Sequence, residues 1–276
     1  MPLLATEAAD RLASAYPHSP IRLRHNLVDE PLLSLAELAA ASAELDPEMV
    51  ERRVHDAGNG EAFTLIGHGG AAGELSGTGP ADQWIMLRLV ERLPRYRALL
   101  ESIIAELGSA ITGGTGAPRD IKGFIFVSAP HTHTPFHFDA EFNILFQIAG
   151  SKTFATYPPR PPFVELAQRE TYHRNGDNML GWEPEYAGAA TLHALEPGDA
   201  VFVPHAAPHW VKVGDEPSIS LSLTWQNAWS NSVADALALN PLLRRFGLPV
   251  TDPAQIRRTP RLRAVAGKIA QKAGAL

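Results

Sequence analysis

The chain has 276 residues, with 24 lysines and arginines against 30 aspartates and glutamates, which gives a formal net charge of −6. Hydrophobic residues make up 45% and charged residues 20% of the chain, a composition that excludes a disordered or collagen-like protein. Cysteine is absent, which excludes disulfides, thiolate zinc sites, iron–sulfur clusters and cysteine nucleophiles. A metal site in this chain must therefore be built from histidine, carboxylate and water, and the acidic balance gives no reason to expect nucleic acid as a partner.

The N-terminal segment has no basic flank before an apolar run, and no stretch approaches about 18 consecutive apolar residues. We therefore expect no signal peptide, no membrane span and a cytoplasmic protein. Residues 1–57 are expected to be helical, with a capping box from Ser34 to Glu37 at the start of an Ala/Leu-rich run. The glycine-rich segment 58–80 lacks the Gly-Lys-Ser/Thr ending of a phosphate-binding loop and is expected to be an irregular surface loop.

A dense apolar run at 84–90 predicts a buried strand, and a helix is expected from Pro94 to a stop at Gly108. We interpret 1–120 as a helical and mixed region that packs on a core. Residues 121–230 change character, because short apolar runs alternate with turn signals and no long helix intervenes. The predicted strands are 121–128, 142–149, 153–157, 191–195, 200–204, 210–213 and 219–225.

This pattern favours an antiparallel barrel or jelly roll. The polar segment 158–189 is interpreted as an insertion into it, and 231–276 as C-terminal helices. The predicted fold class is mainly β, with a jelly-roll (double-stranded β-helix, cupin-like) core flanked by N- and C-terminal α-helices.

Seven of the eleven histidines lie between residues 131 and 209, and histidine is the commonest metal ligand. The sharpest feature is His137-Phe138-Asp139, because residues i and i+2 of an extended strand point to the same face. A third ligand is needed, and the best candidate is His209, which follows the turn after the strand 200–203 and begins the next strand. This hairpin could bring His209 against the strand of His137 and Asp139. Two histidines and one carboxylate with open coordination positions form the facial triad of non-haem iron(II) oxygenases.

Other candidates stay open at this point. His205 lies in the turn before His209 and is a rival third ligand, and Glu141 is a possible second carboxylate. The pair His131 and His133 is similar to the metal motif of small bicupins, but it lacks the glutamate that should follow a few residues later.

Residues 131–157 resemble the metal and co-substrate region of JmjC-domain (cupin-like) 2-oxoglutarate oxygenases, closest to the asparaginyl-hydroxylase-like subgroup typified by factor inhibiting HIF. The resemblance covers about 130–226. It implies that His137, Asp139 and His209 bind Fe(II). It implies that Lys152 pairs with the distal carboxylate of 2-oxoglutarate, that Thr134 donates a hydroxyl to it, and that Asn143 lines the same pocket. The sequence departs from the family near the end of the last core strand, where Leu223 or Thr224 stands at the place of a polar Asn.

The residues around Lys152 support the same assignment independently. Asp139 and Lys152 are 13 positions apart in the sequence, so a straight strand would separate them by about 40 Å. The chain must fold back, and Gly150 in the turn Ala149-Gly150-Ser151 can take the positive φ that this requires. We expect Lys152 to begin a strand that returns across the sheet. A buried lysine needs a counter-charge, and a dianionic co-substrate provides one.

The function implied by the resemblance is an Fe(II)- and 2-oxoglutarate-dependent dioxygenase that releases succinate and CO2. We expect hydroxylation of a peptide or protein side chain rather than demethylation, and a small-molecule substrate under 158–189 stays open. The alternatives are a metal-binding cupin enzyme that does not use 2-oxoglutarate and a non-catalytic JmjC-like regulatory module.

The C-terminal segment carries an apolar stripe on an otherwise basic helix. Its members recur at three-, four- and seven-residue spacing and are Leu262, Val265, Ile269 and Leu276. A stripe this narrow suits a helix–helix seam, so we expect a homodimer through the C-terminal helices. The alternative is that the stripe packs on the chain's own β core.

Overall fold

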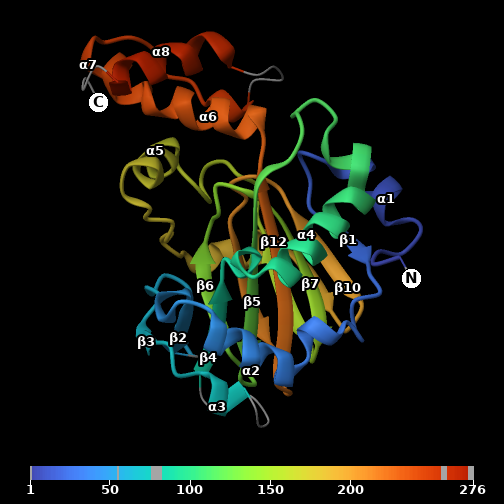
Figure 1. The fold of residues 1–276 in the computed structure, drawn as a ribbon. Helices are drawn as coiled ribbons and strands as arrows, with labels where there is room; N and C mark the ends of the chain where they lie inside the picture. The colour runs from blue at the N-terminus through green and yellow to red at the C-terminus, as the bar shows by residue number, and fades with distance from the viewer. Residues whose placement is uncertain (1, 55, 76–82, 256–259, 273–276) are drawn as a thin grey trace.

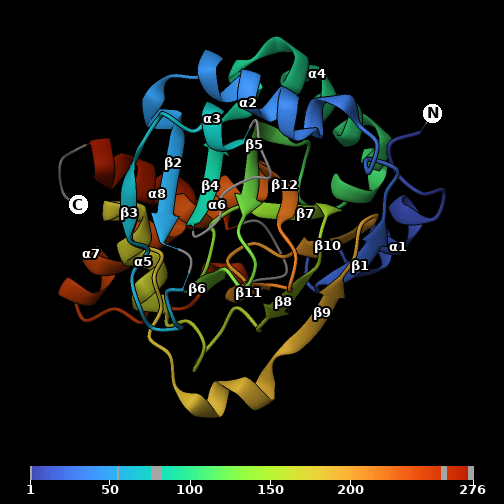
Figure 2. The ribbon, with the colours of Figure 1, turned by 90° about the horizontal axis from the view of Figure 1, so that it is seen from below.

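The computed structural model describes residues 2–54, 56–75, 83–255 and 260–272. Within these residues, twelve strands form two antiparallel sheets (Figures 1 and 2). The larger sheet has the order β1-β10-β7-β12-β5-β4-β2-β3 and the smaller has the order β6-β11-β8-β9. The strands are β1 Ile21–Arg24, β2 Val50–Val54, β3 Leu65–His68, β4 Gln83–Arg88, β5 Arg119–Ser128, β6 His133–His137, β7 Phe142–Ala149, β8 Lys152–Thr156, β9 Thr191–Leu195, β10 Asp199–Val203, β11 His209–Val213 and β12 Ser218–Gln226.

The connectivity from β5 to β12 is that of a jelly roll. Strands β5, β12, β7 and β10 are neighbours in the larger sheet, while β6, β11, β8 and β9 make up the smaller one. The chain therefore crosses between the sheets at nearly every connection, which encloses the space between them. The predicted fold class is confirmed.

Strand β7 shows why the sequence folds into layers. Phe142, Ile144 and Phe146 belong to the core beneath the helices, whereas Leu145 belongs to the core between the two sheets. Strand β12 is similar on its helix side, where Leu221 and Leu223 are fully buried. Because alternate residues point to opposite faces, a strand covered on both sides needs this nearly continuous apolar run.

Helices cover the outer face of the larger sheet, with α2 and α4 lying across it (Figures 1 and 2). The helices are α1 Ala8–Ala15, α2 Leu35–Glu44, α3 Ala72–Leu75, α4 Pro94–Leu107, α5 Leu166–Asn175, α6 Ala228–Ala238, α7 Asn240–Arg245 and α8 Arg261–Lys272. Short 3-10 turns are Pro31–Leu33, Pro47–Met49, Val90–Arg92, Gly108–Ile111, Pro184–Ala189 and Pro253–Gln255. Among the described residues, none of the helices combines the length and apolarity needed to cross a membrane.

Two expectations for the N-terminal region were wrong in part. Residues 1–57 are not wholly helical, because β1 pairs with β10 and β2 pairs with β4, so both extend the larger sheet. The segment 58–80 is not wholly irregular, because β3 pairs with β2 and α3 follows it. These short elements form through pairing with distant strands, which local sequence patterns do not reveal.

The C-terminal helices form a separate layer beside α5 (Figure 1). Helix α8 packs closely on α6, since a Cβ added at Gly267 would lie 2.0 Å from the carbonyl oxygen of Asp235. Helix α5 is part of the segment between β8 and β9. It is tied to this layer by two ion pairs, Arg169 with Asp252 and the buried Glu170 with Arg244.

The apolar stripe does not pack on the chain's own β core. Leu262, Val265 and Ile269 are 89%, 56% and 63% exposed, and α8 instead buries Ala264, Gly267 and Ala270. Leu276, the fourth member of the stripe, lies outside the described residues.

Candidate metal and co-substrate site

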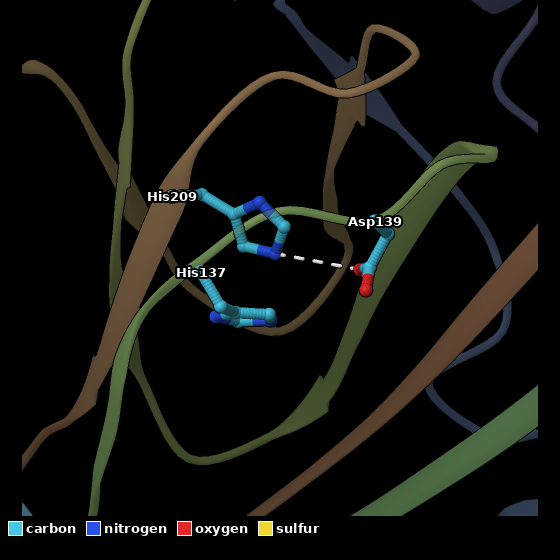
Figure 3. A group of neighbouring side chains, drawn as sticks. All are labelled: His137, Asp139 and His209. Carbon is cyan, nitrogen blue, oxygen red and sulfur yellow. Dashed lines mark ion pairs between the residues drawn. The ribbon is translucent and has the colours of Figure 1, made fainter. Parts of the chain in front are cut away.

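His137, Asp139 and His209 meet between the two sheets (Figure 3). Each offers one ligand atom, and these atoms all lie within 4.8 Å of one another. His137 ends β6, His209 begins β11, and the two residues are directly paired in the sheet, with ring centroids 4.2 Å apart. The Nε2 atom of His209 lies 3.6 Å from Oδ2 of Asp139. The register of β6 and β11 thus produces the grouping.

Backbone hydrogen bonds orient both imidazoles for ligation. Nδ1 of His137 donates to the carbonyl oxygen of Pro135 at 2.7 Å, and Nδ1 of His209 donates to that of Ala207 at 2.9 Å. With the proton on Nδ1, each Nε2 presents a lone pair, the arrangement that holds metal-binding histidines in place. Burial, together with the nearby His137, lowers the pKa of His209 to about 4, so this imidazole is neutral at physiological pH. The donor set therefore fits a divalent metal.

Asp139 reaches the group in a different way from the one expected. The spacing predicts that His137 and Asp139 share one extended strand, but β6 ends at His137. The backbone N–H of Phe138 donates to the carbonyl oxygen of Asn178, and that of Ala206 donates to the carbonyl oxygen of Asp139. These bonds fix the turn, and the Asp139 carboxylate accepts a 3.4 Å hydrogen bond from the Asn178 amide.

The rival candidates lie elsewhere. His205 packs between the rings of Phe142 and Trp229, and burial lowers its pKa to about 3. Glu141 pairs with Lys122 at 2.6 Å. The other pair of histidines also has partners outside the group: His133 donates to the Asn59 side chain, and His131 lies 3.6 Å from Asp215.

The segments leading to His209 and Lys152 also differ from the expectation. Strands β10 and β11 do not form a hairpin, and β8 does not return across the sheet that contains β7, because both connections cross from the larger sheet to the smaller. Gly150 does take a positive φ of 65° in the turn before β8. The close approach of His209 to His137 is as predicted, through pairing of β11 with β6.

A cavity of about 560 Å3 contains the His137–Asp139–His209 group and all three predicted co-substrate residues, Thr134, Asn143 and Lys152. Lys152 is 5% exposed, and its Nζ donates to Oγ of Ser220 at 2.6 Å. Burial lowers the pKa of Lys152 to about 7. In the part of the chain that the structure describes, no carboxylate forms an ion pair with it. A buried ammonium without a counter-charge in a cavity is the environment that an anionic ligand would complete.

Strand β12 supplies polar groups that the sequence reasoning missed. Ser220 bonds Lys152, Ser222 donates to the Asn143 amide oxygen at 2.8 Å, and Thr224 lines the cavity with a buried hydroxyl that has no partner among the described residues. Leu223 faces the opposite core. Hydroxyl residues at alternate positions of this strand are the sequence signal that identifies its cavity face. At the position where the sequence departs from the family that it resembles, Thr224 thus provides a polar group.

No protein-family model and no curated protein matches the chain. Solved structures do share its fold. An X-ray structure of Escherichia coli YcfD has a TM-score of 0.56 at 18% identity, covering 97% of this chain and 68% of that chain. A structure of YcfD, described as a ribosomal oxygenase, in complex with cobalt and 2-oxoglutarate has a TM-score of 0.54 at 17% identity, covering 97% and 67%. A complex with cobalt and succinic acid has a TM-score of 0.51 at 17% identity, with the same coverage.

Proposed function

We propose that the chain is an Fe(II)- and 2-oxoglutarate-dependent dioxygenase that hydroxylates its substrate and releases succinate and CO2. The observation that carries the proposal is the buried, uncompensated Lys152 in the same cavity as a two-histidine, one-carboxylate group. A metal-binding cupin without 2-oxoglutarate has no use for this lysine. A regulatory module has no use for two imidazoles held in the ligating tautomer.

In the proposed reaction, His137, Asp139 and His209 hold the metal. Lys152, with Ser220 beside it, binds the distal carboxylate of 2-oxoglutarate, and Thr134, Asn143 and Thr224 line the remainder of its pocket. When bound, Fe(II) supplies the redox chemistry that couples decarboxylation of 2-oxoglutarate by O2 to substrate hydroxylation. The protein contributes the orientation of these groups and an enclosure between the two sheets that restricts access of bulk water.

The solved YcfD complexes with cobalt and 2-oxoglutarate or succinic acid support this proposal, because they show a related fold with these ligands. The asparaginyl-hydroxylase-like subgroup stays a prediction. So does the substrate class, a peptide or protein side chain or a small molecule. The proposal also keeps the cytoplasmic location expected from the sequence.

The decisive experiment is an anaerobic titration of 2-oxoglutarate into the Fe(II)-loaded protein, following the metal-to-ligand charge-transfer band. The proposal expects a saturable band and, once air is admitted, succinate formation that a substrate increases when peptides and metabolites are screened. A protein that binds Fe(II) but gives no band is not a 2-oxoglutarate oxygenase.

We also propose that the chain forms a homodimer through α8. The exposed residues Leu262, Val265 and Ile269 lie away from the buried side of α8, where Gly267 contacts α6 and Ala264 is also buried. A second copy offers the same stripe, which is what a two-fold symmetric helix seam needs.

A further inference from the structure

The cavity extends beyond the proposed co-substrate pocket, over strands β2 and β4, which lie outside the jelly roll. Here Glu51 is 3% exposed, and its carboxylate accepts hydrogen bonds from two arginines. Arg53 donates to it from Nε at 2.8 Å and from Nη2 at 2.5 Å, and Arg88 donates from Nη1. We call these three residues the arginine pair and its carboxylate.

Strand register places these side chains on the cavity face. Glu51 is paired with Met86, Arg53 with Trp84, and Arg88 with Phe124, and all six residues line the cavity. The Arg53 guanidinium lies 5.2 Å from the ring centroid of Phe63 and 5.6 Å from that of Trp84. Such contacts hold a guanidinium in a fixed orientation before any ligand arrives.

The ring of Phe63 lies next to both Arg53 and His137, one of the proposed metal ligands. It packs against His137 in a T-shaped arrangement, with ring centroids 5.2 Å apart. A molecule held by the arginine pair would therefore lie next to the metal ligands.

The charges of the whole cavity do not balance. Its lining contains four cationic residues, Arg53, Arg88, Lys122 and Lys152, and three carboxylates, Glu51, Asp139 and Glu141. The difference, 4 − 3, is +1, and a divalent metal with dianionic 2-oxoglutarate leaves it unchanged.

The position of the excess charge follows from the pairing. Lys122 is matched by Glu141 at 2.6 Å, and the proposed 2-oxoglutarate would match Lys152. The two guanidinium groups share the single carboxylate of Glu51. Among the described residues, Nε and Nη2 of Arg88 donate to no other protein group, and this side chain is 37% exposed. These N–H groups are available to a ligand.

We propose that Arg53 and Arg88 bind a carboxylate of the primary substrate, and that this substrate is a small carboxylic acid with an apolar body. This inference rests on the proposed oxygenase function and names its substrate class. Arginine is the side chain best suited to pair with carboxylates, because its fork of N–H donors matches their two oxygens. The rings of Phe63, Trp84 and Phe124 provide an apolar wall beside the pair. The cavity volume of about 560 Å3 is that of a small-molecule pocket.

The test measures binding to the full chain by anaerobic calorimetry, with Fe(II) and saturating 2-oxoglutarate present so that the Lys152 position is already occupied. The probes are N-acetylphenylalanine and decanoic acid, their uncharged primary amides, and N-acetylargininamide as a cation. We expect at least one acid to bind, at least about tenfold more tightly than its amide, because the amide cannot accept charge-assisted hydrogen bonds as a carboxylate does. Amides that bind as well as both acids, or a preference for the cation, would overturn the proposal.

The matched variants are Arg88→Gln and Arg92→Gln. Arg92 does not line the cavity and pairs with Asp46 at 3.1 Å. Acid binding should fall at least about tenfold in Arg88→Gln, recover in part in Arg88→Lys and stay unchanged in Arg92→Gln. Equal acid binding by Arg88→Gln and wild type would refute the role of Arg88.

Failure of this proposal can be distinguished from failure of the proposed oxygenase function. The Fe(II)–2-oxoglutarate band should be the same in Arg88→Gln and wild type, which also shows that the variant is folded. No band in either protein, with acid binding retained, counts against the oxygenase alone. If saturating 2-oxoglutarate abolishes binding of the acid, the two share one site and the separate role of the arginine pair is overturned.

Discussion

Replacing Lys152 by methionine should have opposite effects on stability and on ligand binding. The side chain is buried, its Nζ bonds only the hydroxyl of Ser220 among the described residues, and methionine fills a similar volume without a charge. If the role of Lys152 were structural, its replacement would lower the stability of the protein. If Lys152 instead binds an anionic ligand, its buried charge lowers the stability of the protein until that ligand binds.

The size of the stability effect follows from the pKa. Burial lowers the pKa of Lys152 from 10.5 to about 7, which corresponds to roughly 4–5 kcal/mol against the charged form. We therefore expect Lys152→Met to unfold at a higher temperature than wild type when 2-oxoglutarate is absent. Because the unfolded state holds this proton up to pH 10.5 and the folded state only up to about pH 7, the destabilisation is complete below pH 7. It decreases as pH rises from 7 to 10.5.

The effect on binding has the opposite sign. Without the ammonium, the distal carboxylate of 2-oxoglutarate is desolvated without a partner, at a cost of about 2–5 kcal/mol, or roughly 30- to several thousand-fold in affinity. In wild type, a dianion should bind the protonated lysine, so its affinity should be flat below pH 7 and fall by up to about tenfold per pH unit above it. Lys152→Arg should restore affinity only in part, because the guanidinium is longer and forked.

The assay combines thermal unfolding of the ligand-free proteins with anaerobic 2-oxoglutarate titrations from pH 6 to 9. Fe(II) affinity should be unchanged in Lys152→Met, since Lys152 is not among the candidate ligands. If Lys152→Met were less stable than wild type and bound 2-oxoglutarate equally well, the role assigned to this lysine would be wrong.

Three further predictions concern the metal, the fold and assembly. Alanine at each of the three candidate ligands should abolish tight Fe(II) binding in calorimetry, whereas His205→Ala should leave it nearly unchanged. Loss of Fe(II) binding in His205→Ala but not in His209→Ala would show that the third ligand is wrongly assigned. Gly150→Ala should lower the free energy of unfolding by more than about 2 kcal/mol, because φ is positive and the new Cβ would lie 2.3 Å from a backbone oxygen. Gly181→Ala, where the Cβ meets nothing within 4 Å, is the control, and equal stability of the two variants would contradict the argument. Glutamate at both Val265 and Ile269 should halve the mass in light scattering, since both side chains are exposed on the single chain, and an unchanged dimer mass would exclude the α8 seam.

The β core was predictable because its strands carry their own signal. Apolar runs separated by turn residues locate β7, β10 and β12 to within a residue or two. The added strands were not predictable in this way. Strand β1 has two exposed arginines, Arg22 and Arg24, and buries only Leu23, so its sequence says little until β10 lies beside it. Edge strands of this kind depend on pairing across nearly 180 residues.

The residues of the site likewise differ in whether the sequence predicts them. The sequence and the family resemblance both single out the candidate ligands and Lys152, but the paths by which Asp139 and Lys152 reach the cavity differ from those expected. The partner of Lys152 and the arginine pair could not be predicted. Ser220 reaches Lys152 only because β12 belongs to one sheet and β8 to the other. Arg53 and Arg88 share Glu51 only through the register of β2 and β4.

Taken together, the charges in the cavity give an order to the proposed ligands. Lys152 lies deep between the sheets and is 5% exposed, while the Arg88 side chain is 37% exposed at the added strands. An anion entering an empty cavity gains most from the buried ammonium, because an ion pair is strongest where water is least. Once 2-oxoglutarate occupies that position, the arginine pair carries the remaining excess charge and favours a second acid beside the metal ligands. The burial of Lys152, which lowers the stability of the folded protein, thus makes it a stronger anion site than the more exposed arginine pair. The two proposed acids, 2-oxoglutarate and the substrate, therefore bind at different positions in one cavity.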